Sequence, residues 1–440
     1  MAKFRSGVDS APSEPPRSLL EDLRMSTVPV VEDDSYLGTK RWFKKYPELG
    51  DPGIPVEPFT SEDQFARERQ RLWPRVWLMV GRAEHIPESG DYFTKAIPPA
   101  NASLIVVRGR DRVIRAFHNV CSHRGSQLCW ESGFRGHTAA FKCPYHGFTY
   151  DLEGHLRFVP DEANFYDLDK DRMGLRPVVT DIWEGFIFVH LSPNPTEALK
   201  EYLGAITEGL SGYPFHEQNY QYSYRAVLNC NWKLLISSFL EGFHVRTLHA
   251  AGLRRFCSTD NPYSHLDFVK LLGKHRLLSL FVNQAATPTK VADFAFSRYK
   301  KTLAQLSDSA PGGSQPDGTA ALGRFLIRNI FPNFQLNLVM GGWYAYQFWP
   351  LTPDTVLWET RMSFSKPRNA TEHFFQYYAR YASRENLMED GRVTEQQQLA
   401  LKSGVIKRLV LQDEEIAVQH FNSVVQSYTA DEARSQTAGK

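Results

Sequence analysis

Short apolar runs separated by Gly, Pro and Asp turns fill the chain between about Asp91 and Leu191. Examples are SLIVVRG, VIRAFHNV, RPVVTD and GFIFVHL. Such runs bounded by turn residues are typical of antiparallel strands. Ahead of them, the stretch SEDQFARERQRLW has helical character, and Ser61 or Asp63 can cap it. The first half of the chain is therefore predicted to be an antiparallel β domain preceded by a helix.

The second half of the chain mixes helical and strand patterns. Helical spacing is found in NPTEALKEYLGAITEGL, in NWKLLISSFLEGFHVRTLH after the predicted strand QYSYRAVLN, and over most of residues 370–428. Aromatic-rich runs between about Asn333 and Phe364 predict a sheet. Helices and a sheet in one layered unit are typical of the α+β class.

These patterns divide the chain into four parts. We expect residues 1–58 to form a mobile tail and an arm, residues 59–192 the β domain, residues 193–428 the α+β domain, and residues 429–440 a second tail. A length of 440 residues agrees with two or three domains, each able to bury its own core.

Composition narrows the range of functions. The chain has 51 basic and 49 acidic side chains, whereas proteins that track phosphates usually carry a basic excess. The N-terminus lacks the apolar segment of a signal peptide, and no stretch approaches the roughly 18 apolar residues of a membrane span. Five cysteines are too few for a disulfide scaffold. We therefore expect a cytoplasmic protein that binds neither nucleic acid nor membrane, with reduced cysteines available for metal.

Two short motifs each pair a thiol with an imidazole. CSHRG carries Cys121 and His123, and CPYHG carries Cys143 and His146. Common zinc fingers order their ligands Cys, Cys, His, His. The interleaved order found here suits a two-iron cluster, in which one iron takes both cysteines and the other both histidines, as in a Rieske [2Fe-2S] centre. A structural zinc site is the alternative.

CSHRG and CPYHG resemble the Rieske signature of Rieske non-haem iron oxygenases, the large (alpha) subunits of the aromatic ring-hydroxylating dioxygenase family. The resemblance extends from about Phe59 to Val425. It implies a Rieske [2Fe-2S] β domain joined to a helix-grip (START-like) catalytic domain, with a [2Fe-2S] cluster, a mononuclear Fe(II) ion and usually a homotrimer. The chain has no convincing flavin or nicotinamide motif, so electrons are expected from a separate NAD(P)H-dependent reductase or ferredoxin. The resemblance does not decide whether a small beta subunit is also present.

The stretch NWK…FLEGFHVRTLH resembles the family helix that supplies two histidines to the mononuclear iron, which implies His244 and His249 as ligands. On a continuous helix, residues five apart point in different directions. Both imidazoles can therefore bind one ion only if the helix ends or bulges between them. Without the resemblance, two histidines on an apolar helix are more often core residues.

The resemblance also implies a carboxylate ligand far downstream, and Asp413, Glu414 and Glu415 compete for that role. If LVLQDEEIAV is helical, Asp413 lies in the middle of an apolar stripe, where an unpaired carboxylate is costly and a bound cation is a natural partner. We therefore predict Asp413 as the ligand and expect Glu414 and Glu415 to be solvated.

Two further residues are assigned from the resemblance. Most family members have Asp at the position of Glu241, where it connects a Rieske histidine of one subunit to an iron-binding histidine of the next. Some relatives that act on quaternary ammonium compounds have Glu there. Asn231 also matches the family, although its position equally suits an N-cap.

The resemblance implies that O2 and reductase-derived electrons are used to hydroxylate or oxidatively demethylate a small organic substrate. A substrate pocket with an apolar lining would favour a hydrophobic aromatic or cyclic substrate, which we expect here. A pocket that forms an aromatic cage would favour a quaternary ammonium group. A non-catalytic Rieske electron carrier or a zinc-binding module would also contain the two motifs. The candidate pocket residues are Phe239, Phe243, Phe331, Phe334, Trp343, Tyr344, Tyr346 and Trp349.

Overall fold

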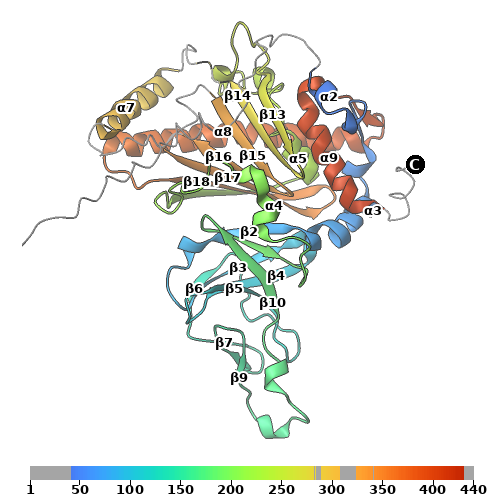
Figure 1. The fold of residues 1–440 in the computed structure, drawn as a ribbon, viewed down its shortest axis with the longest axis vertical. Coiled ribbons are helices and arrows are strands. Elements are labelled where there is room, and N and C mark those ends of the chain that lie inside the picture. The colour runs from blue at the N-terminus through green and yellow to red at the C-terminus, as the bar shows by residue number, and fades with distance from the viewer. Residues whose placement is uncertain (1–40, 282, 284–288, 308–323, 340, 431–440) are drawn as a thin grey trace, which may run out of the picture.

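The computed structural model describes residues 41–281, 283, 289–307, 324–339 and 341–430. It contains two large antiparallel sheets, one from each predicted domain, and confirms the predicted α+β class (Figure 1). None of the helices in these residues combines the length and the apolar character needed to cross a bilayer.

The first sheet has seven strands in the order β2-β11-β10-β5-β4-β3-β6. A three-stranded sheet, β7-β8-β9, lies beyond it at one end of the long axis of the molecule (Figure 1). The bounds are β2 (Trp77–Arg82), β3 (Asp91–Ile97), β4 (Ala102–Arg108), β5 (Ile114–His118), β6 (Arg135–His137), β7 (Phe141–Lys142), β8 (Thr149–Tyr150), β9 (Leu156–Phe158), β10 (Pro177–Trp183) and β11 (Phe186–His190).

The second sheet also has seven strands, in the order β12-β18-β17-β16-β15-β14-β13. The strands are β12 (Tyr220–Leu228), β13 (Leu266–Leu272), β14 (His275–Phe281), β15 (Arg324–Ile330), β16 (Phe334–Val339), β17 (Gly342–Thr352) and β18 (Thr355–Phe364). The helices of this half are α4 (Leu199–Leu203), α5 (Trp232–Ser237), α6 (Val245–Leu248), α7 (Lys290–Ser307), α8 (Ala370–Lys402) and α9 (Ile416–Thr429), and short 3-10 turns connect the elements. Helices α5, α8 and α9 contact this sheet.

The side chains of β17 point alternately to the two faces of the second sheet, and this explains how the two halves of the molecule pack. Successive side chains of a strand point to opposite faces. Trp343 contacts the ring of Phe186 from β11, and the Gln347 side chain donates to the Met79 carbonyl of β2 at 2.6 Å. Tyr344 and Tyr346 alternate with them and face the helices. One face of β17 therefore completes the core with the β domain, and the other is available to a site.

A buried ion pair also joins the two sheets. Lys95 of β3 contacts Glu359 of β18, and both side chains are more than nine-tenths buried. Glu359 further pairs with Arg225 at 2.8 Å and accepts from the Trp349 indole at 3.1 Å. Because each group has a partner, the charges can stay in the interior.

The N-terminal arm belongs to the second half of the molecule. Residues 41–58 form α2 (Trp42–Lys45), the turn η1 (Pro47–Leu49) and β1 (Ile54–Pro55), and β1 pairs with β19 (Arg408–Leu409) near the other end of the chain. The part of the predicted tail before residue 41, and residues 431–440, lie outside the described residues.

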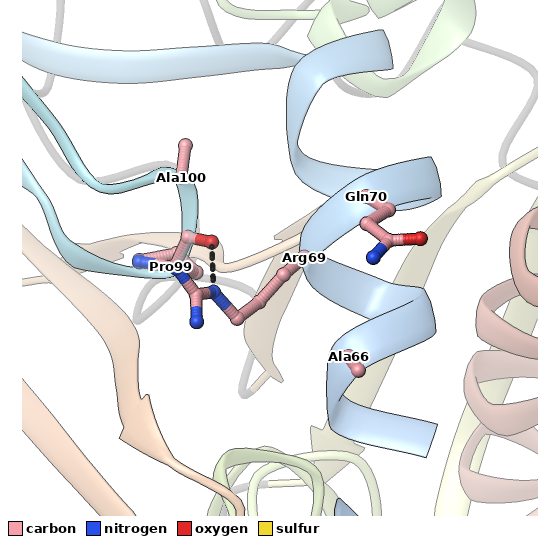
Figure 2. A pocket seen from close by; sticks show the side chains of 5 residues that line it. All are labelled: Ala66, Arg69, Gln70, Pro99 and Ala100. Carbon is pink, nitrogen blue, oxygen red and sulfur yellow. Dashed lines mark hydrogen bonds between the residues drawn. The ribbon is translucent and has the colours of Figure 1, made fainter. Parts of the chain in front are cut away.

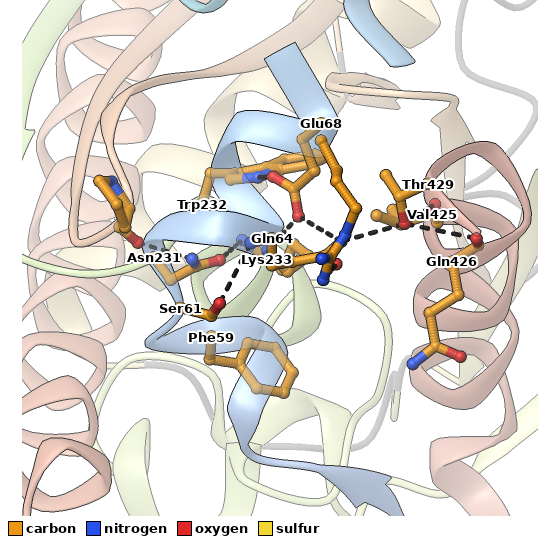
Figure 3. Close-up of polar contacts among 12 residues, drawn as sticks. Phe59, Ser61, Gln64, Glu68, Asn231, Trp232, Lys233, Val425, Gln426 and Thr429 are labelled. Atoms are coloured by element: carbon orange, nitrogen blue, oxygen red, sulfur yellow. Dashed lines mark hydrogen bonds and ion pairs between the residues drawn. The ribbon is translucent and has the colours of Figure 1, made fainter. Parts of the chain in front are cut away.

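The helix predicted from SEDQFARERQRLW begins as expected but does not continue as one α-helix. The Ser61 hydroxyl caps α3 (Glu62–Arg67) by accepting from the Gln64 amide at 3.1 Å. A π-helical turn (Glu68–Leu72) follows, and it directs Glu68 inward. Figure 3 shows Glu68 beside Lys233 and Trp232 of α5, with Oε1 at 2.6 Å from Lys233 Nζ and Oε2 at 2.9 Å from the indole nitrogen. Lys233 and Glu68 are almost completely buried.

Two candidate metal sites

Two similar turns bring Cys121, His123, Cys143 and His146 together. Cys121 and His123 follow β5, whereas Cys143 and His146 lie between β7 and β8. In each turn the glycine four residues after the cysteine donates its amide to the cysteine carbonyl at 3.0 Å. Both glycines, Gly125 and Gly147, have positive φ angles, which L side chains rarely adopt.

The four side chains converge on one small volume. Both thiols are 2% exposed. The rings of His123 and His146 lie 4.6 Å apart, and Phe148 stacks on His123. The Nδ1 atom of His123 is buried without a hydrogen-bond partner among the described residues. A buried ring nitrogen and two buried thiols suit a metal cluster, so the residues present fit a [2Fe-2S] group.

The thiol of Cys121 contacts a tyrosine. Tyr150 Oη lies 3.2 Å from Cys121 Sγ and accepts the Ser122 amide at 3.0 Å. Burial is the largest influence on the Cys121 thiol and raises its pKa. Hydrogen bonds to cluster sulfur tune a cluster's potential, so Tyr150 is a residue of this site that the sequence motifs did not indicate.

The second site is formed at a break between two helices. Helix α5 ends at Ser237, and α6 begins after His244 and ends at Leu248. His244 and His249 are thus the residues that flank α6, and their rings lie 5.1 Å apart. Helix α6 ends at Leu248, directly before His249, so the predicted helix end lies between the two histidines. The longer break between Ser237 and His244 was not predicted.

A carboxylate from α8 completes the cluster. Asp390 Oδ1 lies 3.1 Å from His249 Nε2 and 3.6 Å from His244 Nε2. Ligand atoms of these three residues all lie within 4.8 Å of one another. Two imidazoles and one carboxylate are the facial donor set of non-haem Fe(II) oxygenases, so the residues present fit such an ion.

Further carboxylates face the opposite sides of both rings. His244 Nδ1 contacts the Glu241 carboxylate, and His249 Nδ1 lies 2.6 Å from Glu389 Oε2. A carboxylate only accepts hydrogen bonds, so each contact requires a proton on Nδ1 and leaves Nε2 to face Asp390. Metal-binding histidines are commonly oriented in this way. Glu241 was selected from the sequence, whereas Glu389 and Asp390 were not.

Asp413 does not take part in this site, and the prediction that it binds the metal is wrong. Its carboxylate accepts the backbone amides of Arg41, Trp42 and Phe43 at 2.8 to 3.0 Å and so caps α2. The helical register assumed for it is absent, because α9 begins only at Ile416. Val410, placed in the buried stripe by that register, is 89% exposed.

Asp390 and Thr394 lie on the buried side of α8, where a carboxylate requires a partner. The neighbours of Asp390 on this face include Ser383, Asn386 and Thr394, so the apolar-stripe criterion used for Asp413 does not single it out in the sequence.

Of the two roles considered for Asn231, the structure shows the N-cap. Its side-chain oxygen accepts the Lys233 amide at 3.0 Å, and its amide nitrogen donates to the Pro353 carbonyl at 2.6 Å. Asn231 therefore caps α5, and both ends of its side chain are occupied by backbone groups. It supports the helix that leads to the site and contributes no group to the histidine cluster.

The expectation that Glu414 is solvated is wrong as well. Glu414 is 7% exposed and accepts the Leu266 amide at 2.9 Å and the Trp42 indole at 3.3 Å. Burial, the largest influence, raises the pKa of the Glu414 carboxyl to about 7. Glu415 is half-buried, and burial also raises the pKa of its carboxyl to about 7.

This burial predicts a pH-dependent stability. The Glu414 carboxyl binds its proton more tightly in the folded protein than in the unfolded chain. The free energy of unfolding therefore falls as the pH rises from 4.5 to about 7. At about 1.4 kcal/mol per pKa unit, the loss is about 3 kcal/mol. We expect Glu414→Gln to flatten this slope in urea unfolding measured between these pH values. Glu48→Gln, at an exposed position, should keep the wild-type slope, and equal slopes for Glu414→Gln and wild type would contradict the assignment.

The candidate pocket aromatics divide between two faces. Phe239 packs against Tyr346 and Trp358 on the helix side of the second sheet, with ring centroids 5.4 and 5.5 Å away. Trp343 and Trp349 face the β domain, where they contact Phe186 and Trp73. Phe239, Tyr344 and Tyr346 are therefore the members placed on the same side of the sheet as the histidine cluster.

A small surface pocket lies elsewhere in the molecule. It has a volume of about 250 Å³ and is lined by Ala66, Arg69, Gln70, Pro99 and Ala100. Figure 2 shows Arg69 donating to the Pro99 carbonyl across it, at 3.2 Å. Its lining includes none of the Cys or His residues of the two sites.

Comparison with known proteins assigns both halves. Residues 76–177 match the Rieske [2Fe-2S] domain family, and residues 215–431 match the ring hydroxylating alpha subunit (catalytic domain) family. The glycine betaine monooxygenase oxygenase subunit of Chromohalobacter salexigens is 36% identical over 217 residues, which cover 48% of this chain and 47% of that protein. The carnitine monooxygenase oxygenase subunit of Escherichia coli K12 is 31% identical over 197 residues, covering 44% of this chain and 52% of that protein. These matches span about half the length of the relatives.

Solved structures share the fold over most of the chain. Naphthalene 1,2-dioxygenase from Rhodococcus sp. bound to indole superposes with a TM-score of 0.69 at 20% identity, covering 89% of this chain and 98% of that one. A quaternary ammonium Rieske monooxygenase in complex with L-carnitine gives a TM-score of 0.66 at 19% identity, covering 86% and 96%. The chain therefore belongs to the family of oxygenase alpha subunits that join a Rieske [2Fe-2S] domain to a ring-hydroxylating catalytic domain.

Proposed function

We propose that the protein is the terminal oxygenase component of a Rieske oxygenase system, which uses O2 and electrons from a separate reductase or ferredoxin to hydroxylate or oxidatively demethylate a small organic substrate. The observation that carries this proposal is the convergence of His244, His249 and Asp390. A bound iron would supply O2 activation there, and a [2Fe-2S] cluster on Cys121, His123, Cys143 and His146 would supply single electrons. An electron carrier or a zinc module has no use for the second donor set.

The chain's own residues hold the two sites ready for these groups. Glu241 and Glu389 fix the two ring orientations, and the helix break after Ser237 lets both rings face Asp390. Three ligands from the protein would leave coordination positions of a bound iron open to small molecules.

The arrangement supports electron supply from a neighbouring chain. One cluster turn follows β5 and the other follows β7, which lies toward the opposite end of the long axis from the catalytic half (Figure 1). Glu241 holds His244 and is the residue we propose to connect it to a cluster turn of the next subunit, in a homotrimer. A reductase would dock near Arg124, whose exposed guanidinium lies over the exposed Tyr145 ring. A cytoplasmic location is part of the proposal, because a reducing compartment keeps the cluster thiols available.

We assign the substrate surface to aromatic side chains. Phe239, Tyr346 and Trp358 pack against one another on the same side of the second sheet as the histidine cluster, and such rings would suit a hydrophobic aromatic or cyclic substrate. The same rings would suit a quaternary ammonium group. Glu241 and the names of the curated relatives support this second candidate.

A substrate panel with a surrogate reductase tests the proposed activity. Purified protein with both metal groups is supplied with NADH, reductase and single candidates that include naphthalene, choline, glycine betaine and L-carnitine. We expect O2 consumption that depends on substrate, together with a product heavier by one or two oxygen atoms or lighter by a methyl group. A protein that holds both metal groups, is reduced by the reductase and consumes no O2 with any panel member would contradict the oxygenase assignment.

Glu241→Gln tests the proposed link between sites. The amide cannot hold the His244 ring as a carboxylate does, and loss of such a partner costs roughly 10- to 100-fold in activity. We expect cluster re-oxidation by O2 and substrate, followed by stopped-flow absorbance, to slow by that factor while the cluster spectrum is kept. Glu389→Gln also removes a carboxylate partner from a histidine but lies off the proposed link, so re-oxidation should be slower in Glu241→Gln than in Glu389→Gln. Wild-type re-oxidation in Glu241→Gln would refute the link.

A further inference from the structure

Two buried amide side chains lie on the helix side of the second sheet. Gln335 and Asn337 belong to β16, and strand pairing places them opposite Tyr346 and Tyr344 of β17. Directly paired residues of antiparallel strands present their side chains to the same face, so the two amides share the helix side with these tyrosines. The neighbouring Phe334 agrees with this alternation, because its ring contacts two rings of β11 on the other face.

The segment that carries the first histidine covers this part of the sheet. Its Phe239 ring lies 5.4 Å from the Tyr346 ring of β17. Its Gly242 packs on Leu280 of β14, where a Cβ on the glycine would lie 2.6 Å from Leu280 Cδ2. Alternation along β14 places Leu280 on the same face as Arg276, whose guanidinium contacts a ring of α9. Since β15 and β16 lie between β14 and β17, the helix-side residues of β16 are beneath the segment that leads to α6.

The helix that supplies the metal-binding carboxylate reaches the same part of the sheet. Ser383 Oγ of α8 lies 3.3 Å from the hydroxyl oxygen of Tyr344, the residue paired with Asn337. Ser383 and Asp390 are two helical turns apart, about 10 Å, and share a face of α8. Asn337 therefore lies on the sheet between the histidine-bearing segment and the face of α8 that carries Asp390.

Each of the two amides has an oxygen that lacks a partner. Gln335 and Asn337 are 1% exposed, and neither Gln335 Oε1 nor Asn337 Oδ1 accepts a hydrogen bond from the described part of the chain. Buried Gln347, on the opposite face of the sheet, shows the usual state. Its nitrogen donates to the Met79 carbonyl, and its oxygen accepts from Arg361, both at 2.6 Å. A buried acceptor requires a donor, and next to a candidate catalytic site a substrate can supply one.

We propose that Asn337 Oδ1 and Gln335 Oε1 accept hydrogen bonds from the substrate, so that the substrate is a small organic molecule with an O–H or N–H donor. This inference rests on the proposed function. The neighbouring rings of Phe239 and Tyr346 receive the apolar or cationic part of the same molecule, and the donor fixes its orientation. An analogue without the donor leaves both buried oxygens unpaired and is rejected for that reason. Naphthalene and glycine betaine carry no such donor, so we expect both to be poor ligands.

Matched ligand pairs test this site without requiring turnover. The pairs are choline with ethyltrimethylammonium, L-carnitine with γ-butyrobetaine, 2-naphthol with naphthalene, and indole with indene. In each pair the first member has an O–H or N–H donor that the second lacks. Dissociation constants are measured without O2 on protein that holds both metal groups, by calorimetry or, for the aromatic pairs, by fluorescence. We expect wild type to bind at least one donor-bearing member about tenfold more tightly than its partner, the gain typical of a hydrogen bond to a buried group.

Variants then assign the preference to the two amides. Asn337→Leu and Gln335→Met replace an amide by an apolar group of similar size, so each should remove most of the preference and keep the affinity for the donor-free partner. Asn422→Leu makes the same change at a buried asparagine of α9, whose amide donates to the Val418 carbonyl at 2.9 Å, and should keep the wild-type preference. If wild type shows no preference in any pair, or if both variants keep it, the proposal is overturned. Selective binding without O2 consumption would instead contradict the proposed function and leave the hydrogen-bonding site standing.

Discussion

Asp390→Ala is expected to reduce product formation below detection while the absorbance and EPR signals of the Rieske cluster stay unchanged. Asp390 supplies the only carboxylate oxygen of the described cluster that lies between both Nε2 atoms. Two imidazoles alone hold an iron weakly and leave its charge uncompensated, so the mononuclear iron should be lost with the activity. Metal analysis of the purified variant, alongside product mass spectrometry, checks both parts.

Asp413→Ala is the matched control, because it removes the same group from the residue first expected to bind the metal. It should keep iron and turnover and lose about 1 to 2 kcal/mol of stability, since three amides of α2 lose their acceptor. Loss of iron in Asp413→Ala with normal iron in Asp390→Ala would reverse the assignment.

Lys233→Met is expected to lower the free energy of unfolding by about 3 to 5 kcal/mol, because it leaves the buried Glu68 carboxylate without its cation. The two side chains are 1% and 0% exposed, so solvent cannot replace the lost partner. Urea unfolding followed by circular dichroism measures the change. Since Lys233 lies on α5, ahead of the helix break, the variant should also hold iron less tightly.

Two further variants isolate the charge effect. In Lys233→Met/Glu68→Gln neither residue is charged, so a large part of the lost stability should return. Lys170→Met breaks the exposed pair with Glu162 and should cost less than about 1 kcal/mol. Equal losses for Lys170→Met and Lys233→Met would show that burial does not determine the effect.

The Rieske half could be predicted closely because its chemistry is local. Each cysteine and histidine pair lies within one turn of a few residues, and the glycine that closes the turn is part of the same motif. The strand runs are equally local. Tyr150 was missed because its contact with Cys121 depends on how β8 packs, which no short pattern contains.

The catalytic site depended on long-range packing. The spacing of His244 and His249 was enough to predict a helix end between them, because on a continuous helix the two side chains would point in different directions. It did not predict the longer break after Ser237. The carboxylate was assigned wrongly because a helical register was assumed through residues 406–415, where the chain in fact forms a short strand and a 3-10 turn. Asp390 lies more than a hundred residues from the histidines, and only the docking of α8 on the sheet brings them together.

The alternating faces of β17 have a consequence for recombination between members of the family. One continuous hydrophobic core includes Leu78 and Phe186 of the β domain and Trp343 and Val425 of the catalytic domain. A fragment limited to residues 215–431 would expose Trp343, Gln347 and Trp349 to water. Exchange of the cluster-bearing half between two such proteins therefore requires exchange of the β17 residues that pack against it. The segment that must be exchanged together is thus larger than either of the two regions that match a family.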